Sequence, residues 1–311
     1  MDTPGKAMPE DQAETLAGHG APVVAVRTPD NDDGPFGDLD TARLRNVIAR
    51  RVFGETIDPV RIGRYPTLRR IGQGGMGVVY AAYDNELDRR IAIKLLWRGD
   101  VQDEAEAARM RARMLREARA LAQLSDPSIV QIYEAGEHEG HVFLAMEFVE
   151  GPTLRQWLES ERRSVTDVLE VFAQAGRGLA AAHAAGLVHR DFKPENVVIT
   201  PQGVPKTYRV RVLDFGVALT TRAVQEPELV DAPAANDDAR LTMTGAMIGT
   251  PAYMAPEQID RSRAADARSD QFSFAVALFE ALFGRRPFVG GSITEVVAAT
   301  LAGRIDIPAG R

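Results

Sequence analysis

The spacing of apolar residues changes character along the chain. Beyond Tyr65, short segments rich in apolar and β-branched residues are separated by turn residues, a pattern typical of strands. These segments are LRRIGQGG, GVVYAAYD and RRIAIKLLW, and two more surround the Glu-Gly turn in IVQIYEAGEHEGHVFLAMEFV. Between them, one face of residues 103–124 carries Met110, Met114, Leu115, Ala118 and Leu121. This spacing predicts one long helix packed on a small sheet.

After residue 150 the pattern becomes mainly helical. GPTLRQWLE (151–159) precedes an amphipathic segment, 165–187, that we expect to end at Gly186. Residues 269–284, SDQFSFAVALFEALFG, are apolar nearly all round, which predicts a buried helix ended by Gly284. Residues 188–257 read as strands and loops, and no internal repeat is present. The chain is therefore expected to be α+β, with a β-rich lobe over about 61–149 and a helical lobe over about 150–311.

The first 60 residues differ from the rest. They are rich in Pro, Gly, Asp and Ala with little periodicity, which predicts a mostly disordered extension. Near-helical apolar spacing within 40–53 indicates a short helix there, capped by Asp40 or Thr41. This helix would either bind a partner or form transiently within a tether.

Composition and charge exclude several classes of protein. The 311 residues are 45% hydrophobic and 26% charged, as in ordinary soluble domains. A formal net charge of −7 argues against general binding to nucleic acid, and the absence of cysteine excludes disulfides, thiolate catalysis and cysteine-ligated metals. No apolar run approaches the roughly 18 residues of a membrane helix, and the first residues lack signal-peptide features. We expect a cytoplasmic protein with no membrane segment in this chain.

A glycine-rich motif, G-x-G-x-x-G, occurs in GQGGMGVVY (72–80). Alone it fits a tight hairpin, a dinucleotide fold or a flap over phosphates. A dinucleotide fold requires a helix after the glycines, whereas VVYAAYD predicts a strand. The order strand, glycine loop, strand favours the flap, in which backbone N–H groups approach phosphate oxygens.

Four charged positions are candidates for catalytic or binding roles. Lys94 lies inside IAIKLLW, where a lysine is costly unless it has a partner or extends to solvent from an edge strand. Glu117 on the following helix would supply that partner. Asp214, after a β-branched run and before Phe-Gly, suits a metal ligand or a turn residue. Asp191 in HRDFKPEN would by itself be explained by a salt bridge to Arg190.

Together the motifs resemble the eukaryotic-type (Hanks-type) protein kinases, specifically the bacterial serine/threonine members. The resemblance rests on GQGGMG, IAIK, a helical Glu, HRDFKPEN, DFG, GTPAYMAPE and SDQFSF, in this order from about Tyr65 onward. It implies the two-lobed protein kinase fold and transfer of the ATP γ-phosphate to protein serine or threonine. It also implies activation-loop autophosphorylation and, by weaker analogy, a homodimer through the small lobe.

The resemblance assigns roles to individual residues. Lys94, paired with Glu117, would contact the α- and β-phosphates, Asp191 would orient the substrate hydroxyl, and Lys193 would neutralise the transferring phosphate. Asn196 and Asp214 would bind Mg2+. The residues implied to form the ATP site are Gly72, Gly74 and Gly77 in the flap, Val79, Ala92 and the gatekeeper Met146 around the adenine, and Glu147 and Val149 through backbone hydrogen bonds.

The same resemblance implies a regulatory set. Phosphate on Thr242 or Thr244 would pair with Arg190 and order the loop between Asp214 and Glu257. Thr250 would contact the catalytic Asp and Lys. The bland alternative is that the two threonines are solvated loop residues. His189 is expected to pack under the catalytic loop.

The chain departs from the family pattern in two ways. Phe192 replaces the commoner Leu, which we expect to be tolerated. We expect the family's last helices to be missing, together with an arginine that pairs with the Glu of APE in the family. Glu257 would then have no evident partner, and the 269–283 helix should expose an apolar patch. The alternative function is therefore a kinase-like binding or scaffold module, weakly active or inactive.

Overall fold

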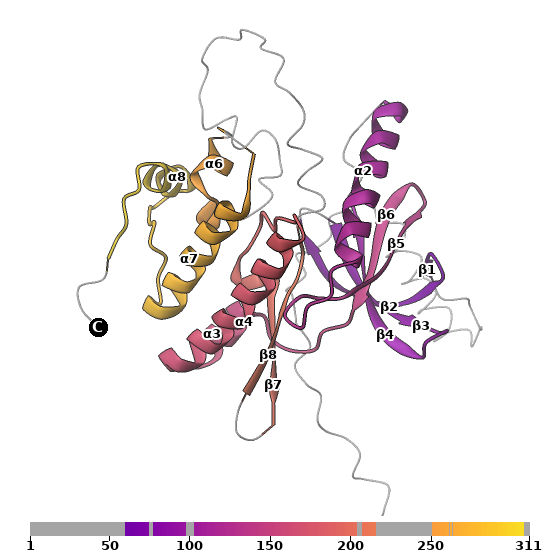
Figure 1. Ribbon diagram of the computed structural model, residues 1–311, viewed down its shortest axis with the longest axis horizontal. Helices are drawn as coiled ribbons and strands as arrows, with labels where there is room; N and C mark the ends of the chain where they lie inside the picture. Colours follow the sequence, from indigo (N-terminus) through magenta and orange to yellow (C-terminus); the bar gives the residue numbers. More distant parts are fainter. Residues whose placement is uncertain are drawn as a thin grey trace, which may run out of the picture.

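The computed structural model describes residues 60–74, 77–97, 103–203, 207–215, 251–260, 262 and 264–307. Within these ranges the chain forms two lobes, one dominated by strands and one by helices (Figure 1). The predicted α+β, two-lobed architecture is confirmed. Apart from Val60, the predicted extension and its 40–53 helix lie outside the described residues. None of the described helices is both long and apolar enough to cross a membrane.

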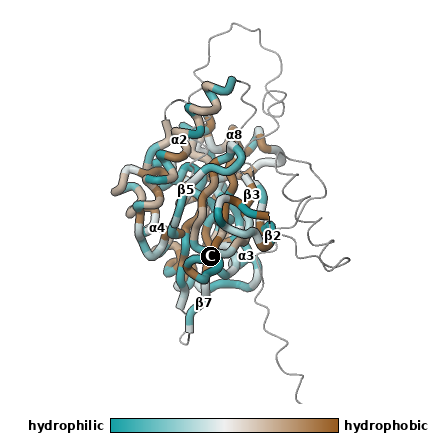
Figure 2. The backbone as a smooth tube through the Cα atoms, turned by 90° about the vertical axis from the view of Figure 1, so that its right-hand side faces the viewer, coloured by the Kyte–Doolittle hydropathy of each residue, from teal (hydrophilic) through white to brown (hydrophobic). Residues whose placement is uncertain are grey.

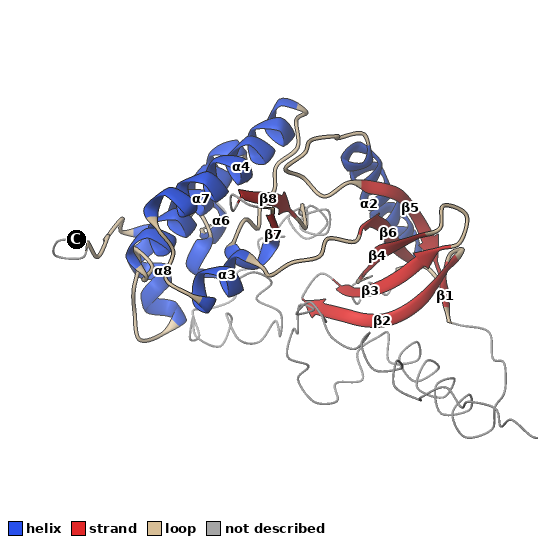
Figure 3. Cartoon of the chain, turned by 90° about the horizontal axis from the view of Figure 1, so that it is seen from below, coloured by secondary structure: helices blue, strands red, loops and turns tan. Residues whose placement is uncertain are grey.

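The small lobe is one antiparallel sheet with a single long helix. The sheet order is β1-β2-β3-β4-β6-β5, and the strands are β1 (Arg61–Ile62), β2 (Tyr65–Gly74), β3 (Gly77–Asp84), β4 (Arg89–Leu96), β5 (Ile132–His138) and β6 (His141–Glu147). Helix α2 (Glu104–Ala122) lies against β5 and β6 (Figure 3). The Asp103 side chain caps it by accepting the N–H of Ala105 at 2.9 Å.

Helix α2 presents the predicted apolar face. Met114, Ala118 and Leu121 are buried, and Met110 and Leu115 pack beside them. The backbone tube of α2 alternates between apolar and polar residues along its length (Figure 2). This amphipathic pattern fixes which side of the helix faces the sheet.

The large lobe is built on helices with a two-stranded ribbon. Its elements are α3 (Leu154–Ser160), α4 (Val165–Ala184), η1 (Pro194–Asn196), β7 (Val197–Gln202), β8 (Thr207–Val212), η2 (Pro251–Tyr253), α6 (Pro256–Ile259), α7 (Ala267–Phe283) and α8 (Ile293–Leu301). Gly186 follows α4 at φ 75°, and Gly284 ends α7 at φ 72°. Both glycines therefore act as the left-handed helix ends predicted for them.

Helix α7 is only partly buried. Ser269, Asp270, Ser273, Val276 and Ala277 are buried, whereas Phe283 is 37% exposed. The expectation of a helix buried all round is therefore wrong, and among its large apolar side chains the exposed one is Phe283 at its end, so the helix itself does not carry the expected apolar patch. Further exposed apolar side chains follow at Val289, Ile293, Leu301, Ile305 and Ile307.

The two lobes share one apolar core and a short backbone connection. Buried residues from α2, β6, α4, β7, β8 and α7 form a continuous cluster. Ile129, just before β5, pairs in parallel with Val212 at the end of β8. The N–H of Val130 donates to the carbonyl of Val212 at 3.0 Å, and the N–H of Val212 donates to the carbonyl of Ser128 at 2.8 Å. The strand leading to Asp214 is thus tied to the small-lobe chain.

Candidate active site

A short network around Asp191 fixes the loop between α4 and β7. The ammonium of Lys193 lies 2.8 Å from Asp191 Oδ2. The amide of Asn196 donates to the Asp191 carbonyl at 2.8 Å and to Oδ2 at 3.2 Å. Both side-chain donors converge on Oδ2, so in the described part of the chain Oδ1 has no hydrogen-bond partner. The carboxylate can therefore accept one further hydroxyl.

Helix α7 anchors the backbone of this loop through Asp270. Its fully buried carboxylate accepts the N–H of His189 at 2.8 Å and the N–H of Arg190 at 2.7 Å, and it also lies 2.7 Å from Nε2 of His183. Arg190 has φ 66°, a left-handed conformation that costs about 1–3 kcal/mol for a non-glycine residue. The two charge-assisted hydrogen bonds offset that strain.

His189 is buried as predicted and is held in one tautomer. Its Nε2 lies 2.7 Å from the carbonyl of Leu213, and its Nδ1 lies 3.3 Å from the N–H of Asp191. Nε2 must donate and Nδ1 must accept, so the ring is neutral. Burial lowers the pKa of His189, against the opposing attraction of Asp270. The ring joins the two segments that carry Asp191 and Asp214.

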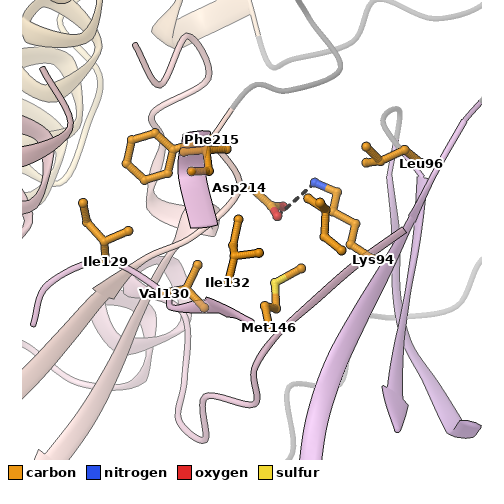
Figure 4. A pocket seen from close by; sticks show the side chains of 10 residues that line it. Lys94, Leu96, Ile129, Val130, Ile132, Met146, Asp214 and Phe215 are labelled. Atoms are coloured by element: carbon orange, nitrogen blue, oxygen red, sulfur yellow. Dashed lines mark ion pairs between the residues drawn. The ribbon is translucent and has the colours of Figure 1, made fainter. Parts of the chain in front are cut away.

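Asp214 faces Lys94 across the gap between the lobes. Lys94 Nζ lies 2.9 Å from Asp214 Oδ1, and Lys94 is 6% exposed (Figure 4). Burial by itself would raise the pKa of Asp214, but the charge and hydrogen bond of Lys94 lower it overall. Asp214 also has φ 57°, so a second left-handed residue stands beside the site.

Glu117 does not pair with Lys94 in this structure, contrary to expectation. Its carboxylate lies 3.3 Å from Nε of Arg113, one turn earlier on α2, while Lys94 pairs with Asp214. Glu117 also contributes to the electrostatic surroundings of Arg190, whose pKa is lowered mainly by burial. The helix thus brings Glu117 close to the catalytic loop rather than into contact with the lysine.

The sheet register gathers several predicted ATP-site residues on one face. Val79 pairs with Lys94, and Ala92 pairs with Met146. Directly paired residues of antiparallel strands point to the same side, and Ala92 and Lys94 are two positions apart. The face that these four side chains share is the one turned toward the large lobe and α2, because Ala92 and Met146 belong to the core cluster there.

The glycine loop closes this face at one end. Gly72 pairs with Val79 and Gly74 pairs with Gly77 at the tip of the β2–β3 hairpin. Gly77 has φ 147°, and a Cβ there would lie 2.0 Å from the carbonyl oxygen of Leu95. Only glycine fits at Gly77, whereas Gly72 and Gly74 have open space around them.

The chain that links the lobes has few free backbone groups for binding an adenine. The N–H of Glu147 already donates to the carbonyl of Gln131 at 2.8 Å, so any contact from Glu147 to an adenine would use its carbonyl oxygen. The Glu147 side chain pairs with Arg211 at 3.0 Å and approaches Arg209 at 3.7 Å. Val149 is partly buried beside the core.

A small cavity lies between the sheet, Leu121 of α2 and Asp214, and Met146 is among the residues that line it (Figure 4). Its volume of about 20 Å³ is enough for roughly one water molecule and too small for a nucleotide. Of the residues predicted to bind the nucleotide, Lys94 and Met146 line it. The cavity therefore shares two residues with the predicted ATP site but is not itself large enough to be that site.

The donors available to a metal are few. Asn196 and Asp214 provide hard oxygen atoms, and the described residues contain no group of three or more His, Cys, Asp or Glu placed to hold an ion. Mg2+ is commonly held by one or two protein oxygens together with substrate phosphates. The residues present fit that kind of site.

Some expectations lie beyond the described residues, and some contacts were missed. Thr242, Thr244 and Thr250 are not among the described residues. Glu257 accepts a hydrogen bond from Ser269 at 2.7 Å, so the expectation that it has no partner is wrong. Sequence reasoning did not single out Asp270, although a carboxylate within the apolar SDQFSF segment was a usable signal.

Comparison with known proteins gives a consistent result. Residues 65–308 match the protein kinase domain family model. The chain is 41% identical to serine/threonine-protein kinase PknA of Mycobacterium tuberculosis over 239 residues, which is 75% of this chain and 50% of PknA. It is 39% identical to PknL of the same organism over 246 residues, covering 79% of this chain and 55% of PknL. The chain thus spans about half the length of these curated relatives.

A solved structure shows the same architecture. The kinase domain of M. tuberculosis PknI, a double mutant, is similar with a TM-score of 0.54 at 25% identity. The match covers 75% of this chain and 80% of that one.

Proposed function

The chain belongs to the protein kinase domain family, and from this membership we propose that it transfers the γ-phosphoryl group of ATP to serine and threonine hydroxyls of proteins. The bacterial serine/threonine kinases among its relatives support the choice of acceptor. The observation that carries the proposal is the Asp191 cluster, with Lys193 and Asn196 fixed on one oxygen of the carboxylate.

The cluster suits phosphoryl transfer for electrostatic reasons. Oδ1 of Asp191 accepts the hydroxyl proton of the substrate and aims the oxygen at the phosphorus. Lys193 compensates the charge on the transferring group, since its ammonium is already held beside the reacting position. The protein forms no covalent bond in this proposed reaction. Its main contributions are therefore to position the reacting groups and to compensate their charge.

The ATP site is proposed on the shared face of the sheet. Val79, Ala92 and Met146 enclose the adenine, the glycine loop covers the phosphates, and Lys94 contacts the α- and β-phosphate oxygens. Asn196 and Asp214 hold Mg2+, which when bound supplies positive charge to the phosphate oxygens. Lys94 then exchanges part of its contact with Asp214 for phosphate and Glu117.

Regulation is proposed at Arg190. Its guanidinium meets a phosphate on Thr242 or Thr244, and this contact orders the activation loop. The partly buried position of Arg190 strengthens such a pair, because the surroundings screen it less than water does.

The test is a phosphoryl-transfer assay with Mg2+ and labelled ATP, comparing the 311-residue chain with Asp191→Asn. The amide in this variant keeps the size of the side chain but accepts no proton, so the rate should fall at least 100-fold while nucleotide binding and thermal unfolding stay near wild type. Mass spectrometry should place label on Thr242 or Thr244 in the wild type. Equal labelling of both proteins would overturn the assignment of Asp191.

The same assay addresses the alternative of a binding module. A folded wild type that binds ATP without transferring phosphate to itself, or to serine- and threonine-containing test proteins, would support the kinase-like scaffold. No single residue in the described part of the chain favours that outcome.

A further inference from the structure

Arg155 joins four separate parts of the large lobe. It projects from α3, and its Nε donates to Glu195 Oε1 at 3.0 Å. Its two terminal nitrogens form a forked contact with Glu280 on α7, at 3.0 and 3.2 Å. One of them also contacts the hydroxyl of Tyr253, which itself donates to Glu280. We call Arg155, Glu195, Tyr253 and Glu280 the arginine clamp.

The clamp keeps one charge state. Burial opposes the charge on Arg155, but its hydrogen bonds to Glu280 and Glu195 raise its pKa further above the usual value. Burial, followed by the hydrogen bond to Glu280, raises the pKa of Tyr253 above its usual value. The arginine stays charged and the phenol stays protonated across the physiological range. The clamp is therefore a fixed support and is not a proton relay.

One arm of the clamp ends next to the proposed catalytic groups. Glu195 precedes Asn196 in η1, and Asn196 donates to both the carbonyl and the carboxylate of Asp191. The carbonyl of Asn196 also accepts the N–H of Leu213 at 2.8 Å, one residue before Asp214. A shift at Glu195 would move its neighbour Asn196. Through the hydrogen bonds of Asn196, the shift would reach Asp191 directly and Asp214 by way of Leu213.

The other arms rest on a rigid element. Glu280 belongs to α7, the helix that also carries the buried anchor Asp270. The carbonyl of Tyr253 accepts the hydroxyl of Ser273 on the same helix at 2.7 Å. Glu195 is the more open of the two acids in the clamp, with 43% of its side chain exposed against 14% for Glu280. Without Arg155, the loop would keep its tie to α7 at residues 189–190 through Asp270, but the part that carries Glu195 would lose its link to Glu280.

We propose that Arg155 is a positioning residue for phosphoryl transfer. By linking Glu195 to Glu280 on α7, it fixes the catalytic loop so that Asp191 stands where it can orient the substrate hydroxyl. This inference rests on the proposed function. Misplacing a reacting group by about 1 Å can cost on the order of 100-fold in rate. Arg155→Ala should therefore lower kcat about 10- to 100-fold. The KM for ATP should change less than about threefold, because the residues proposed to contact the adenine and the α- and β-phosphates lie on the sheet.

Conservative variants distinguish the loss of the hydrogen bonds of Arg155 from the loss of its side-chain volume. Lysine offers one ammonium and cannot satisfy two carboxylates and a phenol in a planar fork, so Arg155→Lys should recover only part of kcat. Glu195→Gln keeps the shape of the loop but weakens its attachment, so it should lower kcat in the same direction. Millimolar methylguanidinium should partly restore kcat in Arg155→Ala by occupying the vacated position.

The control is Arg163→Ala. Arg163 follows α3 and is more enclosed than Arg155, with 8% of its side chain exposed against 25%. It bonds the Trp157 carbonyl and Ser160, and none of its hydrogen-bond partners in the described part of the chain lies in the catalytic loop. It should lower the melting temperature while leaving kcat within about twofold of wild type.

The experiment measures kcat, KM for ATP, melting temperature and amide hydrogen exchange of residues 189–196 in the 311-residue chain and these variants. Faster exchange and lower kcat in Arg155→Ala, but not in Arg163→Ala, supports the proposal. Wild-type kcat and exchange in Arg155→Ala overturns it, as does the same kcat loss in Arg163→Ala. If Arg155→Ala fails to fold, wild-type kcat in both Arg155→Lys and Glu195→Gln overturns it. An inactive wild type refutes the proposed function instead, and the exchange data still decide whether Arg155 fixes the loop.

Discussion

The carboxylate of Asp270 accepts the backbone N–H of Arg190 at 2.7 Å, across 80 residues of sequence. Arg190 is left-handed at that point, so the contact fixes a backbone conformation that the residue type disfavours. The proposed catalytic residue Asp191 follows immediately. The direction of its side chain is thus set by a helix far away in the sequence.

Replacing Asp270 with asparagine should be strongly destabilising. The carboxylate accepts from two backbone N–H groups and lies against His183, whereas an amide has one acceptor oxygen and presents an NH2 group to the remaining donors. The free energy of unfolding should fall by about 3–5 kcal/mol. Urea unfolding of Asp270→Asn measures this.

Asp306→Asn is the control for that substitution. Asp306 has 41% of its side chain exposed and pairs with Arg285 at the surface, so its loss should cost less than about 1 kcal/mol. Equal losses in the two variants would contradict the anchoring role of Asp270.

The glycine loop supplies a matched pair of substitutions. Gly77→Ala places a Cβ 2.0 Å from the Leu95 carbonyl oxygen at φ 147°, so it should cost about 2 kcal/mol or more. Gly74→Ala meets nothing within 4 Å and should change stability by less than about 1 kcal/mol. Thermal unfolding of both variants tests the hairpin geometry, and a neutral Gly77→Ala would show it to be wrong.

Lys94→Met should lower the free energy of unfolding at pH 7, and this loss should become smaller as the pH falls. In the wild type the pKa of Asp214 is lowered, so its carboxylate stabilises the fold above pH 3.8 and loses that contribution as pH falls through the lower folded pKa. Without Lys94, burial dominates and the pKa of Asp214 rises above its usual value. At pH 7 the variant should be less stable by about 2 kcal/mol.

The measurement is the free energy of unfolding at pH 7 and at about pH 5. The deficit of Lys94→Met should shrink at the lower pH, because protonating Asp214 removes the unpaired charge. Arg90→Met, which breaks an exposed pair with Glu150, should show a small deficit that does not shrink. A pH-independent deficit in Lys94→Met would mean that Asp214 has another cation.

His189 should weaken the fold in mild acid. Its pKa is lowered in the folded chain relative to 6.5, so the unfolded state takes up the proton first. The contribution of the neutral ring is complete above about pH 6.5 and is lost as pH falls, until the folded pKa is reached. Unfolding free energies between about pH 7.5 and 5 should fall more steeply for the wild type than for His189→Gln. Identical slopes would contradict a buried neutral ring.

The sequence predicted elements better than partners. The β-branched runs, the 3.6-residue spacing around Met114 and the glycine at 284 act locally, so strands, helix faces and helix ends followed from them. Lys94 was found because a buried lysine needs compensation. Which acid compensates its charge depends on how α2 packs against the sheet. In the structure Lys94 pairs with Asp214, and Glu117 pairs with Arg113 on its own helix.

Contacts among distant residues were beyond local patterns. In the sequence, Asp270 is one polar position in an apolar segment. Its role is seen in the folded chain, where its carboxylate accepts the backbone N–H groups of His189 and Arg190. Arg155 gives no local signal of its role, because the three side chains that it binds come from three other elements. Sequence reasoning identified the proposed reacting groups, and tertiary structure was needed to find what holds them.

The parallel pairing of Ile129 with Val212 has a mechanical consequence. Asp214 stands two residues from that pairing, so it would move little if the two lobes turned about the pairing. In the sheet order, β3 and β2 lie three and four strands away from β5, the strand that follows Ile129, so their hairpin would move farther. Opening and closing would then vary the cover over the phosphates while the carboxylate near the pairing stays almost still.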